Sequence, residues 1–258
     1  MSHFEITDGI LESYSGTDSN IIIPEGVTAI GESAFEGNRT LTQVTLPDGL
    51  NSLEYRAFKN CKNLRSIALP ESITRIENSV FSGCEKLKGI NIPANLKHIG
   101  TYAFYGDERL FRFHLADGTL RTWLRDTYSF QRETGMLKKF LCADIQEQQE
   151  LFPEFDDTKY KSAIVYYFMH TGRADDAVTA SAKRNITKTA KFYIDCQESD
   201  GMAELLGTGF ITKKNIDKLI QYAIDEKCYE IQVMLMNYKF SHFSSEDPEK
   251  IIMRKFRL

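Results

Sequence analysis

The sequence lacks the usual signatures of an enzyme or a metal protein. Its five cysteines form no CxxC pair, and its five histidines stand at no metal-ligand spacing. It contains no glycine-rich phosphate loop, no GxSxG elbow and no HExxH motif. The stretch GTGF, which begins at Gly207, has neither a preceding strand nor a third glycine, so it indicates a turn between helices. The sequence therefore predicts no catalytic residue, no cofactor and no metal site.

Further absences concern partners and location. The net charge is −4, and the one basic cluster, at residues 254–257, is typical of a solvated tail, so we expect no nucleic-acid partner. No apolar run approaches the ~20 residues of a membrane span. The opening residues, MSHFEITDGI, lack the pattern of a signal peptide. We therefore expect no membrane insertion and a cytoplasmic protein, or a secreted one if a signal preceded Met1.

What the sequence does contain is a repeat of about 23 residues in its N-terminal half, a period typical of solenoids. Four phenylalanines share this spacing, each preceded by alanine or valine, and four of the six prolines share it too. The columns are Phe35, Phe58, Phe81 and Phe104; Pro24, Pro47, Pro70 and Pro93; Leu41, Leu64, Leu87 and Leu110; Val44, Ile67, Ile90 and Phe113; Ile30, Leu53, Ile76 and Ile99. Several columns in phase over four units exclude coincidence.

A unit of this length is too short to bury its apolar face alone, so the units must stack into a solenoid. Within a unit, LTQVTLP alternates as a half-buried strand does. Stacked copies predict a parallel sheet, in which each proline marks the end of a strand because it cannot donate to the ladder. GVTAIG, at 26–31, indicates a second short extended segment, and the phenylalanine column is predicted to fill the centre.

These columns resemble the BspA-like leucine-rich repeats, whose pattern is close to "IP", "V..IG..AF.gC..L..V.LP". The resemblance covers about residues 4–115. It implies a right-handed coil with a strand-lined recognition face, and some members of the family are secreted adhesins.

One column holds Asn38, Cys61, Cys84 and Asp107, just after the aromatic residues. Adjacent rungs lie ~4.8 Å apart, within disulfide range for Cα atoms. A redox pair of Cys61 and Cys84 is one interpretation. The other, which we favour, is a turn position where a small side chain serves the local backbone.

The alternation also predicts which strand residues point outward. With the apolar column inside, the outward positions of successive rungs form a candidate face for a protein partner. These residues are Gln43, Thr45, Ser66, Asn91, Arg112 and His114. Most are small or neutral, and only Arg112 and His114 resemble interface hot spots, so this face predicts weak binding by itself.

The phase of the repeat stops near residue 117. Leu120, Trp123 and Leu124 then show helical spacing, which predicts a helix capping the open end of the solenoid. Residues 126–152 are predicted to be a linking helix. Later apolar stripes, separated by HTGRAD, QESDG, GTGF and DEKCY, predict helical hairpins, and residues 215–239 are similar to an ankyrin-type helix pair.

The expected fold is thus an α+β protein made of two repeat arrays. Residues 1–117 form the leucine-rich-repeat solenoid, 118–152 the capping and linking helices, and 153–258 the all-α, ankyrin-like hairpins. The leading function is a non-enzymatic module or scaffold for protein–protein interaction. Two alternatives stay open: a secreted or surface adhesin-like binder of host matrix or carbohydrate, and an enzyme with a site between the domains, in a pocket containing Cys142, His170 or paired carboxylates.

Overall fold

The computed structural model describes residues 3–106, 109–124, 137–152 and 158–243. The chain divides into two compact units, residues 1–167 and 168–258. This division differs from the three segments expected from the sequence, because residues 118–167 belong to the same unit as the repeats. Each unit is described by itself below.

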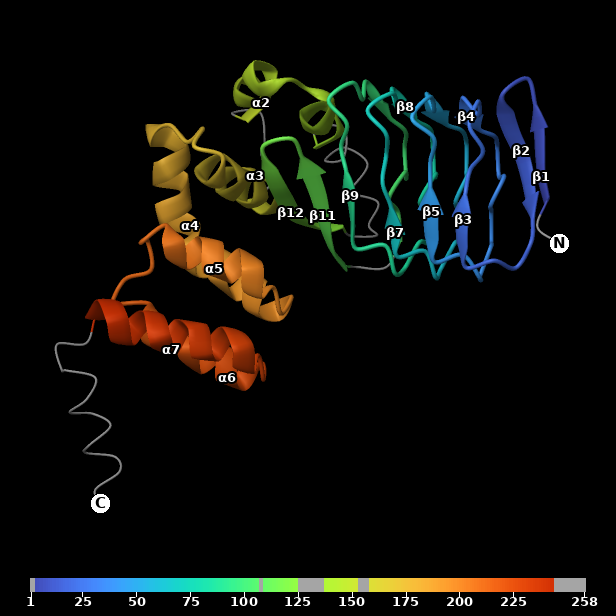
Figure 1. Cartoon of the computed structure of the whole chain (residues 1–258). Helices are drawn as coiled ribbons and strands as arrows, with labels where there is room; N and C mark the ends of the chain where they lie inside the picture. The colour runs from blue at the N-terminus through green and yellow to red at the C-terminus, as the bar shows by residue number, and fades with distance from the viewer. Residues whose placement is uncertain (1–2, 107–108, 125–136, 153–157, 244–258) are drawn as a thin grey trace. The chain divides into compact units, whose positions relative to one another are not determined.

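The first unit is a solenoid with strands on two sides (Figure 1). One side is a six-stranded sheet in the order β1-β2-β4-β6-β8-β10. Its strands are β1 (His3–Thr7), β2 (Ile10–Ser15), β4 (Ala29–Ile30), β6 (Ser52–Leu53), β8 (Arg75–Ile76) and β10 (His98–Ile99). From β2 onward the pairing is parallel, and from β4 to β10 each strand residue pairs with the residue one repeat further along the chain.

The other side consists of two three-stranded sheets, β3-β5-β7 and β9-β11-β12. Their strands are β3 (Asn20–Ile22), β5 (Gln43–Thr45), β7 (Ser66–Ile67), β9 (Gly89–Asn91), β11 (Arg109–Leu115) and β12 (Gly118–Leu124). Strands β3, β5, β7 and β9 each end two or three residues before a proline of the repeated column, which confirms the predicted stop.

The phenylalanine column forms the centre of the solenoid. The rings of Phe35, Phe58, Phe81 and Phe104 are stacked, with centroids 5.0, 5.7 and 5.7 Å apart in sequence order. Tyr14 continues the stack before Phe35 at 5.3 Å. Phe58 and Phe81 are fully buried. The column is therefore one continuous aromatic core and not a set of separate clusters.

The turn that holds each Ala-Phe pair forms a third ladder between rungs. In the rung of Phe58, the N–H groups of residues 56, 58 and 60 donate to the carbonyls of residues 78, 80 and 82 in the next rung, at 3.1, 3.1 and 2.7 Å. The same pattern recurs one repeat earlier and one repeat later. The turn requires a left-handed residue in every rung, and these are Ser33, Arg56, Ser79 and Tyr102, with φ of 55° to 60°.

Both ends of the repeats are closed by antiparallel hairpins. At the start, β1 pairs with β2 through the Asp8-Gly9 turn, in which both residues have positive φ. At the far end, β11 pairs in parallel with β9 and in antiparallel fashion with β12, through a turn at Ala116 and Asp117. The predicted capping helix at 118–124 is therefore wrong: this segment is a strand. It completes the backbone hydrogen bonds of an edge that β11 would otherwise leave open.

Short helices follow the hairpin in the first unit. Residues 137–142 are helical, and α2 (Ile145–Leu151) begins at Asp144, whose side chain accepts from the N–H of Glu147. The described part of the predicted linking helix is therefore helical but broken in two, and residues 125–136 lie outside the described residues. The first turns of α3 (Thr158–His170) lead to Tyr167, whose hydroxyl donates to Asp117 in the hairpin turn.

The second unit is all-α, as expected. After the end of α3 come α4 (Asp176–Asp195), α5 (Ser199–Gly207), α6 (Ile216–Asp225) and α7 (Tyr229–Phe243). The four predicted breaks coincide with the helix ends. Of the apolar residues predicted for α4 and α6, Ile186, Tyr193 and Leu219 are among the buried ones, whereas Ile224 is 41% exposed.

The hairpin turns share one C-cap geometry. Gly172, Gln197 and Lys227 have φ of 69°, 53° and 57°. In each case the next residue donates its N–H to the carbonyl five residues earlier, at 2.9 Å. This is the Schellman motif, which ends a helix with a left-handed residue. Two of the positions, Gln197 and Lys227, lie in the turns of successive helix pairs, α4–α5 and α6–α7.

Candidate functional site

The predicted face lies on the side formed by β3, β5, β7, β9, β11 and β12. Gln43 pairs with Ser66 in the backbone register of β5 and β7, and Arg112 pairs with Gly89 in that of β11 and β9. Gln43, Thr45, Ser66 and His114 are exposed, and Arg112 is half-buried. The structure therefore places the six predicted residues on one side of the solenoid, in two neighbouring sheets.

Three of these side chains are free among the residues that the structure describes. Gln43, Thr45 and Ser66 make only backbone hydrogen bonds there. Because the strand backbone is fixed by neighbours on both sides, these groups are held on a rigid surface. They can bond to a partner without first breaking an internal bond.

Asn91 has a different role from the one predicted. Its side-chain oxygen accepts from the N–H of Leu69 at 2.7 Å, and its side-chain nitrogen donates to the carbonyl of Leu69 at 2.6 Å. The amide thus bridges β9 to the backbone that follows β7, where the regular ladder between the two sheets is interrupted. Asn91 is a structural bridge, and a partner could use it only by breaking both bonds.

His114 and two arginines form the carboxy-terminal part of the face. His114 lies over Gly89, where an added Cβ would come within 3.1 Å of its Nε2, and its Nδ1 is 3.1 Å from the hydroxyl of Thr119. Arg112 and Arg121 occupy paired positions of β11 and β12. Burial, followed by the charges of both arginines, lowers the pKa of His114 from its ordinary value of 6.5. The imidazole is therefore neutral at pH 7, and the positive charge here belongs to the arginines.

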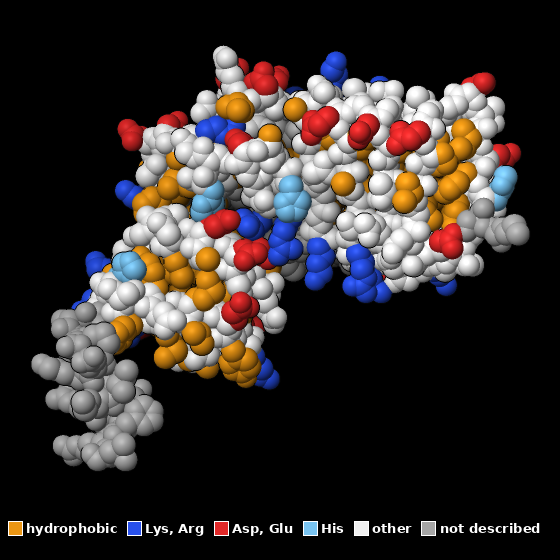
Figure 2. Space-filling view, in the orientation of Figure 1, with side chains coloured by type: hydrophobic (Ala, Val, Ile, Leu, Met, Phe, Trp, Pro, Cys, Tyr) orange, Lys and Arg blue, Asp and Glu red, His pale blue; other side chains and the backbone are white. Residues whose placement is uncertain are grey.

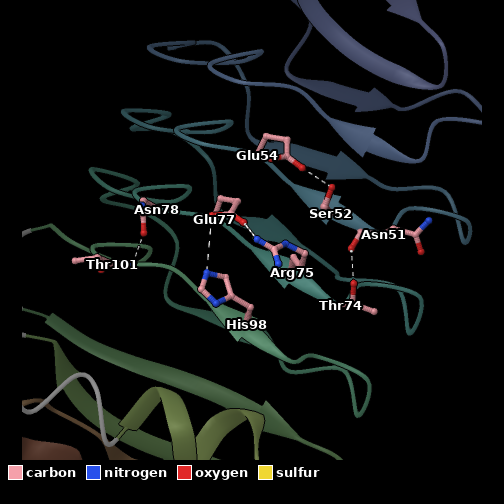
Figure 3. Close-up of polar contacts among 9 residues, drawn as sticks. All are labelled: Asn51, Ser52, Glu54, Thr74, Arg75, Glu77, Asn78, His98 and Thr101. Carbon is pink, nitrogen blue, oxygen red and sulfur yellow. Dashed lines mark hydrogen bonds and ion pairs between the residues drawn. The ribbon is translucent and has the colours of Figure 1, made fainter.

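The opposite side of the solenoid carries charges that sequence reasoning did not single out (Figure 3). Glu77 bonds to Arg75 on the same rung, and its other oxygen is 3.8 Å from Nε2 of His98 on the next. Ser52 donates to Glu54 at 2.6 Å. These residues precede or follow the inward positions Leu53, Ile76 and Ile99, so the repeat itself was the available signal. Their groups already bond to one another, in contrast to those of Gln43 and Ser66.

The turn cysteines serve the backbone. Cys61 donates to the carbonyl of Phe35 at 3.0 Å, and Cys84 to that of Phe58 at 3.1 Å. Both thiols are buried, and neither forms a disulfide with another described residue. Burial raises the pKa of Cys61 from 9.0 to about 12. In the same column, Asn38 accepts from the N–H groups of Thr40 and Leu41. The interpretation as a local backbone position is supported over a redox pair.

The residues named for an enzymatic alternative have ordinary environments. Burial raises the pKa of Cys142 to about 11, so its thiol is protonated at neutral pH. His170 lies 3.3 Å from a carboxylate oxygen of Glu204. Across the described parts of the chain, no group of three or more His, Cys, Asp or Glu could hold a metal ion, and no described helix is long and apolar enough to span a membrane.

Comparison with known proteins agrees with the repeat. The family model of the BspA type leucine rich repeat region matches residues 11–134, in six copies. No curated protein matches the chain.

Similar solved structures are bacterial leucine-rich repeat proteins. One from T. pallidum is 24% identical and has a TM-score of 0.36; the match covers 40% of this chain and 64% of that one, so it spans less than two thirds of that protein. One from Bacteroides ovatus is 32% identical over 41% of this chain and 31% of that chain, with a TM-score of 0.37. One from Bacteroides capillosus is 29% identical over 44% and 93%, with a TM-score of 0.36.

The second unit has no counterpart in the family match, and its likeness to ankyrin stays a prediction. For the first unit, the repeated columns, the in-register strands and the family match agree. Residues 11–134 therefore form a BspA-type leucine-rich repeat region.

Proposed function

We propose that the chain is a non-enzymatic protein-interaction module and that its partner contacts the side of the solenoid formed by β3, β5, β7, β9, β11 and β12. Leucine-rich repeat proteins generally mediate protein–protein interactions, and the repeat region makes this the default activity. We choose this side because three exposed side chains on it, Gln43, Thr45 and Ser66, make no side-chain bond to the described part of the chain. We name this set the free polar face.

Charge is distributed unevenly along this side of the solenoid. Its amino-terminal part is neutral, whereas β11 and β12 contribute Arg112 and Arg121. Lys88 and Arg65, exposed beside β9 and β7, add positive charge at its edge. A partner with a polar surface that is acidic at one end matches this arrangement. The opposite side offers a weaker match, since Glu77 is neutralised by Arg75.

Size limits the strength of the contact. Six strands at ~4.8 Å and about three residues of ~3.3 Å each give a flat area of about 285 Å². A stable interface buries about 800 Å² on each partner. This side of the solenoid alone therefore supports only a weak contact. A firm complex requires further contacts from the chain, for which we propose the helical second unit as the source.

The test compares two variants of the full chain. In Gln43→Arg/Ser66→Arg, bulky charges stand on the free polar face. In Thr17→Arg/Asn51→Arg, the same charges stand at other exposed neutral positions, outside the six strands of that side. Quantitative mass spectrometry of proteins captured from a native lysate should show one protein retained by the parent and the control variant but reduced at least tenfold with the face variant. Equal capture by both variants, with unchanged melting temperatures, would overturn the assignment.

A further inference from the structure

The hairpin at the N-terminal end of the solenoid covers only one of its two sides. The first rung consists of β2 and β3, which pair with β4 and β5 of the second rung. On the side of β2, strand β1 extends the sheet by one further strand. On the side of β3 the sheet ends, because no described strand pairs with the outer edge of Asn20–Ile22. We name this edge the open edge.

The backbone of β3 directs hydrogen-bonding groups to the open edge. In the second rung, the carbonyl of Thr45 accepts from the N–H of Ile23 at 2.9 Å, so the backbone groups of Thr45 point back toward the first rung. Asn20 and Ile22 pair in register with Gln43 and Thr45. Because alternate residues of a strand bond to opposite neighbours, the N–H and C=O groups of Asn20 and Ile22 point away from β5. They present donors and acceptors in the arrangement that a further strand requires.

Apolar side chains lie beside the open edge. Ile22 is 75% exposed, more than any other large apolar residue of the described chain. The ring of Phe4 in β1 stacks on Tyr14 with centroids 5.1 Å apart, so this face of β1 points to the centre of the solenoid. Phe4 is nevertheless half-buried, and Ile6 on the same face is 41% exposed, whereas Phe58 in a later rung is fully buried. The inner face of β1 thus lacks the cover that a strand on the side of β3 gives to each later rung.

The charged residues at this end of the solenoid are all acidic. Residues 3–38 contain no Lys or Arg, and their acidic residues are Glu5, Asp8, Glu12, Asp18, Glu25, Glu32 and Glu36. Asp18 and Glu25 are exposed and flank β3, with Cα atoms within about 10 Å of its ends. This is also about the distance over which charges act at physiological salt. Figure 2 shows acidic side chains around hydrophobic ones near this end of the solenoid.

We propose that an extended segment of a second protein, apolar in its middle and basic at both ends, adds as a strand to the open edge. In strand addition, main-chain hydrogen bonds supply affinity and alternate side chains supply specificity. The apolar side chains of the segment pack against Ile22 and the inner face of β1, and its Lys or Arg residues lie beside Asp18 and Glu25. The site is independent of the free polar face, because it uses the backbone edge of β3 and not the side chains of β5 and β7.

Charge disfavours a second copy of this chain as the occupant. If two open edges paired with each other, Asp18 and Glu25 of both copies would come together, and like charges across an interface repel. Natural edge strands avoid partners by means of lysine, proline or inward-pointing charges. The residues of β3 are Asn, Ile and Ile, so none of these devices is present in the strand itself.

The first experiment measures the affinity of the full chain for two fluorescent peptides, KRVIVRK and its proline analogue KRVPVRK. The parent should bind the first at least about tenfold more tightly, because proline removes a donor without changing the charge. Ile22→Pro removes the outward N–H of β3 at an edge position where proline is tolerated, and should weaken binding of KRVIVRK by about tenfold. The matched variant Ile22→Thr keeps this N–H and should weaken it by about threefold or less.

Amide hydrogen exchange then locates the peptide. KRVIVRK at saturation should slow exchange of the N–H groups of Asn20 and Ile22 at least about threefold, since these become hydrogen-bonded. The N–H of Ile23 already bonds to Thr45 and should change little. Melting temperatures of both Ile22 variants, measured alongside, confirm that the fold is retained.

Four results would overturn the proposal. Equal affinity for the two peptides, or for the parent and Ile22→Pro, would mean that charge alone attracts them. Protection at Ile6 and not at Asn20 and Ile22 would place the peptide on the edge of β1. A dimer mass in light scattering, with protection of Asn20 that is lost on dilution, would assign the open edge to a second copy. Absence of binding at about 1 mM peptide would mean that the edge accepts no basic strand.

Discussion

The two units present different surfaces at their described ends. In the solenoid, both ends are closed by hairpins whose strands join the sheets, β1–β2 at one end and β11–β12 at the other. In the helical unit, the last described helix, α7, has an exposed stripe of apolar side chains on one face, formed by Tyr229, Val233, Met236 and Phe240. Backbone edges are closed by hydrogen bonds from a strand, whereas an apolar helix face needs side chains from another helix. The two ends therefore differ in chemistry: the solenoid ends on paired strand backbone, whereas α7 presents apolar side chains.

The largest expected effect compares the cores of the two units. Phe81→Ala removes a fully buried ring that is stacked on Phe58 and Phe104. It should lower the free energy of unfolding by about 3–5 kcal/mol. Leu235→Ala in α7 should cost about 2–4 kcal/mol, since the side chain is smaller. Urea unfolding followed by circular dichroism measures both, and a loss below about 1 kcal/mol for Phe81→Ala would contradict the continuous aromatic core.

The next effect compares a residue that supports the backbone, Asn91, with one that we assign to recognition, Ser66. Asn91→Ala leaves the N–H and the carbonyl of Leu69 without their side-chain partner, and should cost about 1–3 kcal/mol. Ser66→Ala, on the same side of the solenoid, breaks no side-chain bond and should change stability by less than about 0.5 kcal/mol. Thermal unfolding of the two variants decides the matter: equal melting temperatures would show that Asn91 is not a bridge.

A third effect is the pH dependence of the free energy of unfolding that arises from Cys61, in the solenoid. The pKa of Cys61 is raised from 9.0 to about 12, so the folded state holds the thiol proton more tightly than the unfolded state. The stabilisation is complete below pH 9 and is lost as the pH rises from 9 toward 12. The slope approaches about 1.4 kcal/mol per pH unit for one proton. Cys61→Ala should reduce the slope in urea titrations at pH 8 to 10.5 by the contribution of one proton, while Cys142, whose pKa is raised to about 11, contributes a slope that remains. An unchanged slope would mean that Cys61 is not one of the groups responsible.

The smallest effect compares the left-handed turns. Lys227→Gly relieves a left-handed lysine at a helix C-cap and should raise stability by about 0.5–1 kcal/mol. Ser79→Gly does the same in the solenoid turn, where φ is 60°. The gain there should be similar or smaller, because that backbone is also held by hydrogen bonds to the next rung. A loss of stability in both variants, measured by thermal melting, would show that the strain of the left-handed backbone does not determine the change in the free energy of unfolding.

The repeat columns made most of the solenoid predictable. Phe58, Ile67 and Pro70 each recur at the same fixed period, and a short period shared by several columns has one simple physical explanation, a stack of rungs. The helix ends were predictable for a similar reason, since polar or glycine-bearing breaks separate the apolar stripes.

The features that were missed depend on contacts distant in sequence. Leu120, Trp123 and Leu124 have a spacing that fits a helix, yet the same segment is also an alternating strand after an Asp-Gly pair, and the open edge of β11 selects the strand. The bridging role of Asn91 arises from the interruption between β7 and β9, which no local pattern marks. The exposed stripe of α7 was missed because its residues alternate with buried ones such as Leu235, and apolar composition alone does not tell the two sides apart.

The most direct test of the central claim is photocrosslinking of the intact chain to its partner. A photoreactive phenylalanine analogue is placed at Ser66 on the free polar face or at Asn51, an exposed neutral position outside that face. Irradiation in native lysate should give a single crosslinked species from position 66 and none from position 51. A crosslinked partner obtained from position 51 and not from 66 would contradict the assignment of the free polar face as the surface for recognition.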